Sequence, residues 1–273
     1  MAVRATRTAA LALAASAFAL SPAAARAHDC VVACASQPGH VEVQLQSSYG
    51  AISRDEGAGS FAGLALFASA AVAEGVNVSA LLPTYAVDFG GTRRSGLGDV
   101  SLGVSRASVR GNGSFYVASV AHLPTGDAAE GLGAGHAMIM LGTGGTFAPP
   151  GRLRFGLDLL DALAPTVSEH HVHTPQLVAP HSMHELFYEG WGAVRLGDAS
   201  LRAGVAGQTT LASGGGLRTA ITPTFSVGMP LASGWAASWA VHAPSAGRGY
   251  FGWQTTLAVT RALGSAGCDG VVP

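Results

Sequence analysis

Half of the ten histidines in this chain lie in one short segment, "EHHVHTPQLVAPHSMHE", which covers residues 169–185. Imidazole is a common ligand for zinc, copper and nickel, so this crowding predicts a metal site on a single segment. In an extended chain His171 and His173 point to the same side, and Glu185 adds an oxygen ligand. The candidate metal ligands are His170, His171, His173, His181 and His184.

The alternative interpretation of this segment is a solvated polar loop. Pro165, Pro175 and Pro180 favour an extended chain over a helix, and histidine is an ordinary polar residue for an exposed loop. Specific binding of zinc, copper or nickel is therefore one of two hypotheses, and the choice depends on where the loop lies.

The N-terminus predicts a secreted protein. Arg4 and Arg7 precede an apolar run over residues 9–20, and "ARA" at 25–27 has the small-x-small pattern of a cleavage site. This arrangement is typical of a secretory signal peptide. We therefore expect residues 1–27 to be removed and residues 28–273 to form a single domain.

The composition narrows the class of protein. Charged residues make up 11% of the chain against a usual share of about 25%. The formal net charge of −1 argues against nucleic acid as a partner. The mean hydropathy is positive, yet no apolar run after the signal peptide reaches the roughly 18 residues of a membrane-spanning helix. A secreted apolar chain of this kind predicts a β-barrel whose partner is the lipid of an outer membrane.

Alternating side chains support this prediction. Apolar residues recur at every second position, with polar or small residues between them, over 41–49, 99–106, 152–160, 185–196 and 200–208. Period two over about ten residues is typical of barrel strands. The fold class is therefore all-β, an antiparallel up-and-down transmembrane β-barrel. About twelve strands are expected, near 40–49, 61–73, 76–85, 97–109, 114–123, 135–147, 152–162, 184–196, 199–210, 217–229, 234–243 and 249–261.

The connections alternate in length, which sets the orientation of the barrel. Tight turns follow every second strand, and longer gaps cover 50–60, 86–96, 124–134, 163–183 and 211–216. Outer-membrane barrels have short periplasmic turns and long outer loops. The histidine segment is then the fourth and longest outer loop, facing the outside of a Gram-negative cell. A soluble β-sandwich is the alternative fold. Many outer-membrane barrels end on an aromatic residue, and the tail "GSAGCDGVVP" departs from that pattern.

Three glycine-rich motifs carry a resemblance to a known family. "GLGD" (96–99), "PTGD" (124–127) and "GLGAG" (131–135) occur in an order that resembles the outer-membrane family named for the MetA pathway of phenol degradation. The match covers about fifty residues and rests on Gly96, Leu97, Gly98, Asp99, Pro124, Thr125, Gly126, Asp127, Gly131, Gly133 and Gly135. The resemblance implies a transporter-like barrel that passes small hydrophobic or aromatic molecules and depends on the barrel-assembly machinery.

The same motifs have a simpler physical interpretation. "PTGD" suits a tight turn, because proline presets φ and glycine accepts a positive φ. "GLGAG" lacks the spacing of a dinucleotide-binding loop. No G-x-S-x-G, H-E-x-x-H or P-loop pattern appears either, so the sequence predicts no enzyme and no cofactor beyond the candidate metal.

Strand parity predicts which charged residues face the interior. If leucine, valine and phenylalanine face lipid, the charged residues between them face inward, where an arginine avoids a cost of about 2–4 kcal/mol at the centre of the lipid face. Such residues form either a polar conduit or a salt-bridged plug. The predicted lumen-lining residues are Glu42, Arg152, Arg154, Asp158, Glu185, Glu189, Arg195 and Arg202.

All three cysteines lie at the chain ends, outside the predicted strands. Because the first and last strands of a barrel are neighbours in an oxidising compartment, Cys268 is a candidate to pair with Cys30 or Cys34. A local Cys30–Cys34 bridge is the competing pairing. A third possibility is copper bound by the free amine and imidazole of His28 beside the two thiolates.

Three functional hypotheses follow. The first is an outer-membrane channel or transporter-like barrel for small, hydrophobic or aromatic solutes. The second is a non-transporting surface barrel that captures metal ions through its histidine-rich outer loop. The third, a barrel with a catalytic outer loop, is disfavoured by the missing enzyme motifs.

Overall fold

The computed structural model describes residues 38–54, 57–164, 177–178, 184–211, 218–232, 234–243, 246–247 and 251–263. The predicted signal peptide 1–27 lies outside these residues, as do Cys30, Cys34 and Cys268. Four of the candidate metal ligands, His170, His171, His173 and His181, lie outside them as well.

The described residues form an all-β structure in which every strand pairing is antiparallel. The strands are β1 (Val41–Arg54), β2 (Gly57–Ala73), β3 (Val76–Phe89), β4 (Thr92–Leu97), β5 (Val100–Arg110), β6 (Gly113–Leu123), β7 (Met138–Phe147), β8 (Leu153–Leu163), β9 (His184–Leu196), β10 (Ala199–Thr210), β11 (Arg218–Ala232), β12 (Trp235–His242), β13 (Ala246–Gly247) and β14 (Phe251–Leu263).

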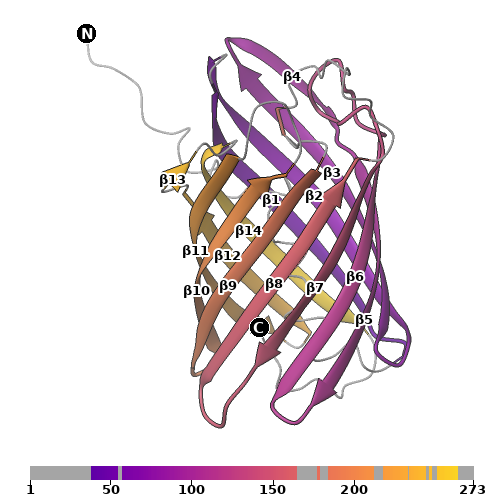
Figure 1. Cartoon of the computed structure of the whole chain (residues 1–273), viewed down its shortest axis with the longest axis vertical. Coiled ribbons are helices and arrows are strands. Elements are labelled where there is room, and N and C mark those ends of the chain that lie inside the picture. The colour runs from indigo at the N-terminus through magenta and orange to yellow at the C-terminus, as the bar shows by residue number, and fades with distance from the viewer. Residues whose placement is uncertain are drawn as a thin grey trace.

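The sheet closes on itself (Figure 1). Each wall strand pairs with its neighbours along the chain, β10 pairs with β11, and β1 pairs with β14 from Val41↔Leu263 onward. The short strands β4 and β13 pair only with β3 and β11. In the part of the chain that the structure describes, the other twelve strands form the wall, which confirms the predicted twelve-stranded up-and-down barrel.

Side-chain parity explains why the sheet closes as it does. Large apolar side chains recur on the outer surface at every second position, and the side chains between them turn inward. Many of the inward side chains are small or polar, and others, such as Phe61 and Leu160, belong to buried apolar clusters. A closed sheet leaves no unpaired edge, so this outer surface can contact lipid along its whole circumference. The fold and this apolar belt indicate an outer-membrane location. Exposed members of the belt include Leu45, Leu64, Leu102, Phe115, Leu141, Leu157, Val205 and Trp239.

A search of the described residues for helices finds none with the length and apolar character needed to span a membrane.

Two predicted loops are shorter than expected. β1 continues to Arg54 and β2 begins at Gly57, so strand replaces most of the loop predicted over 50–60. Similarly, β3 continues to Phe89 and β4 begins at Thr92, inside the loop predicted over 86–96. These extensions lie at the long-loop end, at the top of Figure 1. Both faces can meet water there, so the apolar alternation that reveals a membrane strand is lost.

The strand predicted over 97–109 begins later, at Val100, and the short strand β4 precedes it. β4 pairs with the upper half of β3 from Thr84 to Phe89, whereas β5 pairs with its lower half from Val76 to Leu81. Between the two strands, Gly98 and Asp99 belong to neither strand; they are the last two residues of the "GLGD" motif. This break between β4 and β5 lets an outer loop approach the wall at this point.

Candidate functional site

Asp158, on β8, is the centre of a polar cluster in the barrel interior. Its side chain is 5% exposed, and each of its carboxylate oxygens accepts a hydrogen bond. Tyr116 on β6 donates its hydroxyl to Oδ1 at 2.7 Å, and Trp191 on β9 donates its indole N–H to Oδ2 at 3.2 Å. Two neutral donors therefore hold a buried carboxylate.

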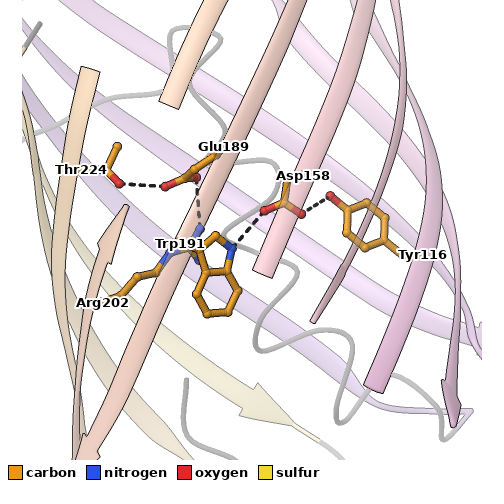
Figure 2. A network of polar contacts seen from close by, with 6 residues as sticks. All are labelled: Tyr116, Asp158, Glu189, Trp191, Arg202 and Thr224. Carbon is orange, nitrogen blue, oxygen red and sulfur yellow. Dashed lines mark hydrogen bonds and ion pairs between the residues drawn. The ribbon is translucent and has the colours of Figure 1, made fainter. Parts of the chain in front are cut away.

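A second carboxylate, Glu189 on β9, lies directly across from Asp158 in the strand register. It is fully buried and accepts from Arg202 at 3.0 Å and from Thr224 at 2.8 Å. The guanidinium carbon of Arg202 also lies 4.0 Å from the centre of the Trp191 ring. Figure 2 shows how Trp191 and Arg202 join the two carboxylates into one network that spans β6 to β11.

Glycines on neighbouring strands make room for the large members of this network. A Cβ atom added to Gly144 would collide with Tyr116 and with the Asp158 carboxylate, and one added to Gly156 would collide with the indole of Trp191. At Gly204 an added Cβ would lie 2.8 Å from the Cβ of Trp191. The interior is therefore closely packed at this level, and the glycines are part of the site.

The predicted lumen-lining residues occupy several places. Asp158, Glu189 and Arg202 meet in the network. Arg154 and Arg195 lie with Arg152 around a pocket at the short-turn end. Glu185 is buried higher on β9 and accepts from Gln208 at 2.9 Å. Glu42 is buried on β1, which lies between β2 and β14 and therefore away from the strands of the network.

Three members of the network were not predicted from the sequence, namely Tyr116, Trp191 and Thr224. All three share the strand parity of inward-facing residues, and the prediction considered only charged side chains. Buried tyrosine and tryptophan usually direct their polar atoms to a hydrogen-bond partner. An aromatic residue at an inward position therefore indicates a polar contact inside the barrel, and this pattern could have identified Tyr116 and Trp191.

One candidate metal ligand, His184, falls within the described residues. It begins β9, and its Nε2 lies 2.7 Å from Oδ1 of Asp161 on β8. Among the residues that the structure describes, no group of three or more histidine, cysteine, aspartate or glutamate side chains is arranged to hold a metal ion.

The "GLGD" and "PTGD" motifs together fix the third outer loop to the wall. Asp99 accepts a hydrogen bond from the backbone N–H of Gly126 at 2.8 Å and another from Ala134 at 2.6 Å. Val100 donates its backbone N–H to the Thr125 hydroxyl at 2.8 Å. One carboxylate at the β4–β5 break thus holds both ends of the loop segment 126–134.

This loop and the fourth outer loop place apolar side chains inside the barrel. Leu132 from the third loop, with Leu177 and Val178 from the fourth, packs against four inward-facing wall residues, and the backbone N–H of Leu177 donates to Gly131 at 2.9 Å. We call this group the outer apolar cluster; it comprises Ile52, Phe61, Tyr85, Val87, Leu132, Leu177 and Val178. Leu177 and Val178 are 0% exposed, so the loops fill this side of the interior.

Three solved structures with a similar fold are remote from this chain in sequence. An outer membrane channel from Pseudomonas putida F1 is 11% identical with a TM-score of 0.65, covering 83% of this chain and 96% of that one. The NanC porin is 9% identical with a TM-score of 0.52, covering 82% and 99%. The CymD monoaromatic hydrocarbon channel is 9% identical with a TM-score of 0.50, covering 92% and 94%.

The chain matches no family model and no curated protein. Membership of the family suggested by the "GLGD" and "PTGD" motifs therefore stays a prediction. At these identities the structural similarity establishes the barrel fold and leaves function to be argued from the interior.

Proposed function

We propose that this barrel is an outer-membrane channel for small hydrophobic or aromatic molecules, closed at its outer end by two loops. The observation that carries the proposal is the outer apolar cluster. Loop residues Leu132, Leu177 and Val178 occupy the interior against the wall residues Phe61 and Tyr85. When these loops withdraw, an apolar and aromatic surface inside the barrel becomes available to a solute.

The way the loops are held supports a closure that can be reversed. Asp99 holds the third loop through hydrogen bonds to backbone N–H groups. Leu177 and Val178, the described residues of the fourth loop, contribute apolar packing, and Leu177 donates a backbone hydrogen bond to the third loop. Contacts of these kinds can break without disturbing the pairing of the wall strands. Remote similarity to a monoaromatic hydrocarbon channel points to the same class of solute.

Single-channel recording with the purified barrel tests this proposal. We expect the wild-type protein to open rarely and Asp99→Ala, which removes both acceptors for the loop, to open more often or for longer. Asp88→Ala is the matched control, because the Asp88 carboxylate pairs with the exposed Arg93 at the same end of the barrel. Intact cells carrying the Asp99→Ala barrel should also take up benzyl alcohol faster than cells without it.

Failure of the proposal has a clear signature. If neither the wild type nor Asp99→Ala conducts ions or admits benzyl alcohol, the interior is a permanent filling rather than a conduit. Equal effects of Asp99→Ala and Asp88→Ala would show that the loop is not the barrier.

A further inference from the structure

A pocket of about 300 Å³ opens at the short-turn end of the barrel, bounded by the β7–β8 turn and by β8, β9 and β10. Three arginines line it: Arg152, Arg154 and Arg195. Arg154 and Arg195 have the strand parity of the buried Asp158 and Trp191, with no register shift between β8 and β9. Their side chains therefore belong to the interior face and not to the lipid face.

These arginines lie unusually close to one another in the strand register. The backbone N–H of Arg195 donates to the carbonyl of Arg152 at 2.9 Å, so the two residues are directly opposite across β8 and β9. Residues paired in this way have Cβ atoms about 5 Å apart, and like charges there are destabilising. Arg154 follows Arg152 by two positions on the same face. A bound anion would be attracted by the charges of Arg152 and Arg154.

The interior carboxylates do not neutralise Arg152 or Arg154. All four oxygens of Asp158 and Glu189 already accept hydrogen bonds from other side chains, as described above. Arg152 and Arg154 form no ion pair with any residue that the structure describes. Asp198, in the β9–β10 turn, is exposed and is not part of the lining.

The rest of the lining is apolar apart from one hydroxyl. Pro149, Pro150, Leu153 and Val194 belong to the lining, and Ser200 lies opposite Arg195 in the register of β9 and β10. Leu153 and Val194 pair with each other and have the parity of the lipid face, so the pocket lies at the rim of the barrel, where both faces of the wall contribute. Guanidinium groups match the geometry of a carboxylate, whereas proline and valine favour an apolar body. A ligand that joins a carboxylate to an apolar body fits both parts of the lining.

We propose that this pocket binds a small organic carboxylate with an apolar or aromatic body. The arginines bind the carboxylate, and the apolar part of the lining contacts the body. The site goes beyond the proposed channel function, since an anion can bind here from the short-turn end whether or not the outer loops open. It adds a preference for negative charge to a barrel whose outer end is apolar.

Calorimetry on the purified full-length barrel, with benzoate as the probe, tests the site. We expect wild-type protein to bind benzoate at one site, and Arg152→Gln/Arg154→Gln to bind it at least about tenfold more weakly. Benzyl alcohol, which has the same ring without the charge, should not bind at this site. Arg106→Gln is the matched control, because Arg106 is exposed near the same end, on β5, with outward parity.

Each remaining outcome is decisive. No benzoate binding by the wild type, equal binding by the double variant, or displacement of bound benzoate by benzyl alcohol at equal concentration would overturn the proposal. Heat-modifiable gel mobility confirms that each variant is folded. Benzoate binding by a barrel that never conducts would reject the channel function alone, and conduction without benzoate binding would reject this site alone.

Discussion

At the scale of single residues, the interior depends on how two neighbouring carboxylates are held. Asp158 and Glu189 face each other across β8 and β9, where two negative charges repel. Neutral donors satisfy Asp158, whereas a cation, Arg202, satisfies Glu189 and stacks on the tryptophan that donates to Asp158. Trp191 therefore couples the two carboxylates, so we expect a substitution at either one to change the stability of the whole network.

The ion pair between Glu189 and Arg202 is the first place to test this coupling. Glu189→Gln leaves the cation of Arg202, whose side chain is 9% exposed, without its countercharge. We expect the free energy of unfolding to fall by about 3 kcal/mol, measured by urea titration in lipid vesicles. Glu189→Gln/Arg202→Met should recover part of this loss.

The control for this measurement is the exposed pair of Arg93 and Asp88 at the outer end. Arg93→Gln should change the free energy of unfolding by less than about 1 kcal/mol, because water screens this pair. A Glu189→Gln effect no larger than that of Arg93→Gln would contradict the importance of the network.

The glycines beside the network give a second prediction. Gly156→Ala would place a methyl group against the indole of Trp191, whereas a Cβ added to Gly190 meets nothing within 4 Å. Overpacking should lower the free energy of unfolding of Gly156→Ala by about 1–3 kcal/mol. Gly190→Ala should be close to neutral in the same urea titration. Equal stability of the two variants would show that the space beside Trp191 can accommodate an added methyl group.

The histidine-rich loop carries a prediction that stays open. If residues 170–184 bind metal specifically, calorimetry with zinc, copper or nickel should show stoichiometric binding in the range of about 1 μM or tighter, lost in His171→Ala/His173→Ala. Ligands must be neutral imidazoles, so the affinity should fall as the pH drops through about 6.5. Weak binding that declines in proportion to the number of histidines removed would instead indicate a solvated polar loop.

At the scale of strands, the sequence predicts the membrane-spanning part well and the parts outside it poorly. Strands β9 and β10 begin and end where period two predicts them, because lipid on one side enforces the alternation. The extension of β1 to Arg54 and the pairing of β4 with β3 were missed, since the outer faces there meet water and carry no apolar signal.

The site shows the same division. Parity places Asp158, Glu189 and Arg202 on the inward face. Their hydrogen-bond partners depend on the register between strands, and the alternation of residues within one strand does not determine that register. Thr224 reaches Glu189 from β11, two strands away. The packing of Leu177 and Val178 inside the barrel was also beyond prediction, because a loop without periodicity does not reveal which way its side chains turn.

The pairing of β1 with β14 gives a prediction about the chain ends. Val41 lies opposite Leu263, so β1 begins beside the end of β14. We expect Cys268 to be bridged to Cys30 or Cys34, with Cα atoms within about 7 Å. Peptide mapping without reduction should find Cys268 in a cross-linked fragment. Quantitative alkylation of Cys268 in the oxidised protein would favour the Cys30–Cys34 bridge.

At the scale of the whole molecule, the barrel has two chemically different ends. Long loops and an apolar interior cluster mark one end, and tight turns with an arginine-lined pocket mark the other. In outer-membrane barrels the short turns lie in the periplasm. The arginine pocket would then face the periplasm, and the apolar cluster would face the outside of the cell.

Surface labelling tests this orientation. An epitope inserted between Ala164 and His170, after β8 at the long-loop end, should be reached by antibody on intact cells. An epitope at Asn112, in the β5–β6 turn, should be reached only after the outer membrane is permeabilised. Labelling of both sites, or of the second alone, on intact cells would reverse the assignment of the two ends.

The β1–β14 pairing also limits the order in which this protein can be made. All other wall pairings join strands that follow one another in the chain, apart from the small additions β4 and β13, and so can form as successive hairpins. Closure alone joins distant segments: Gln44 donates to Thr260, 216 positions later. A chain lacking β14 would present two unpaired strand edges to lipid, where unsatisfied backbone groups are strongly unfavourable. Translation and export must therefore finish before the barrel can close, and β1, the first strand to leave the ribosome, keeps one edge unpaired until the last strand arrives.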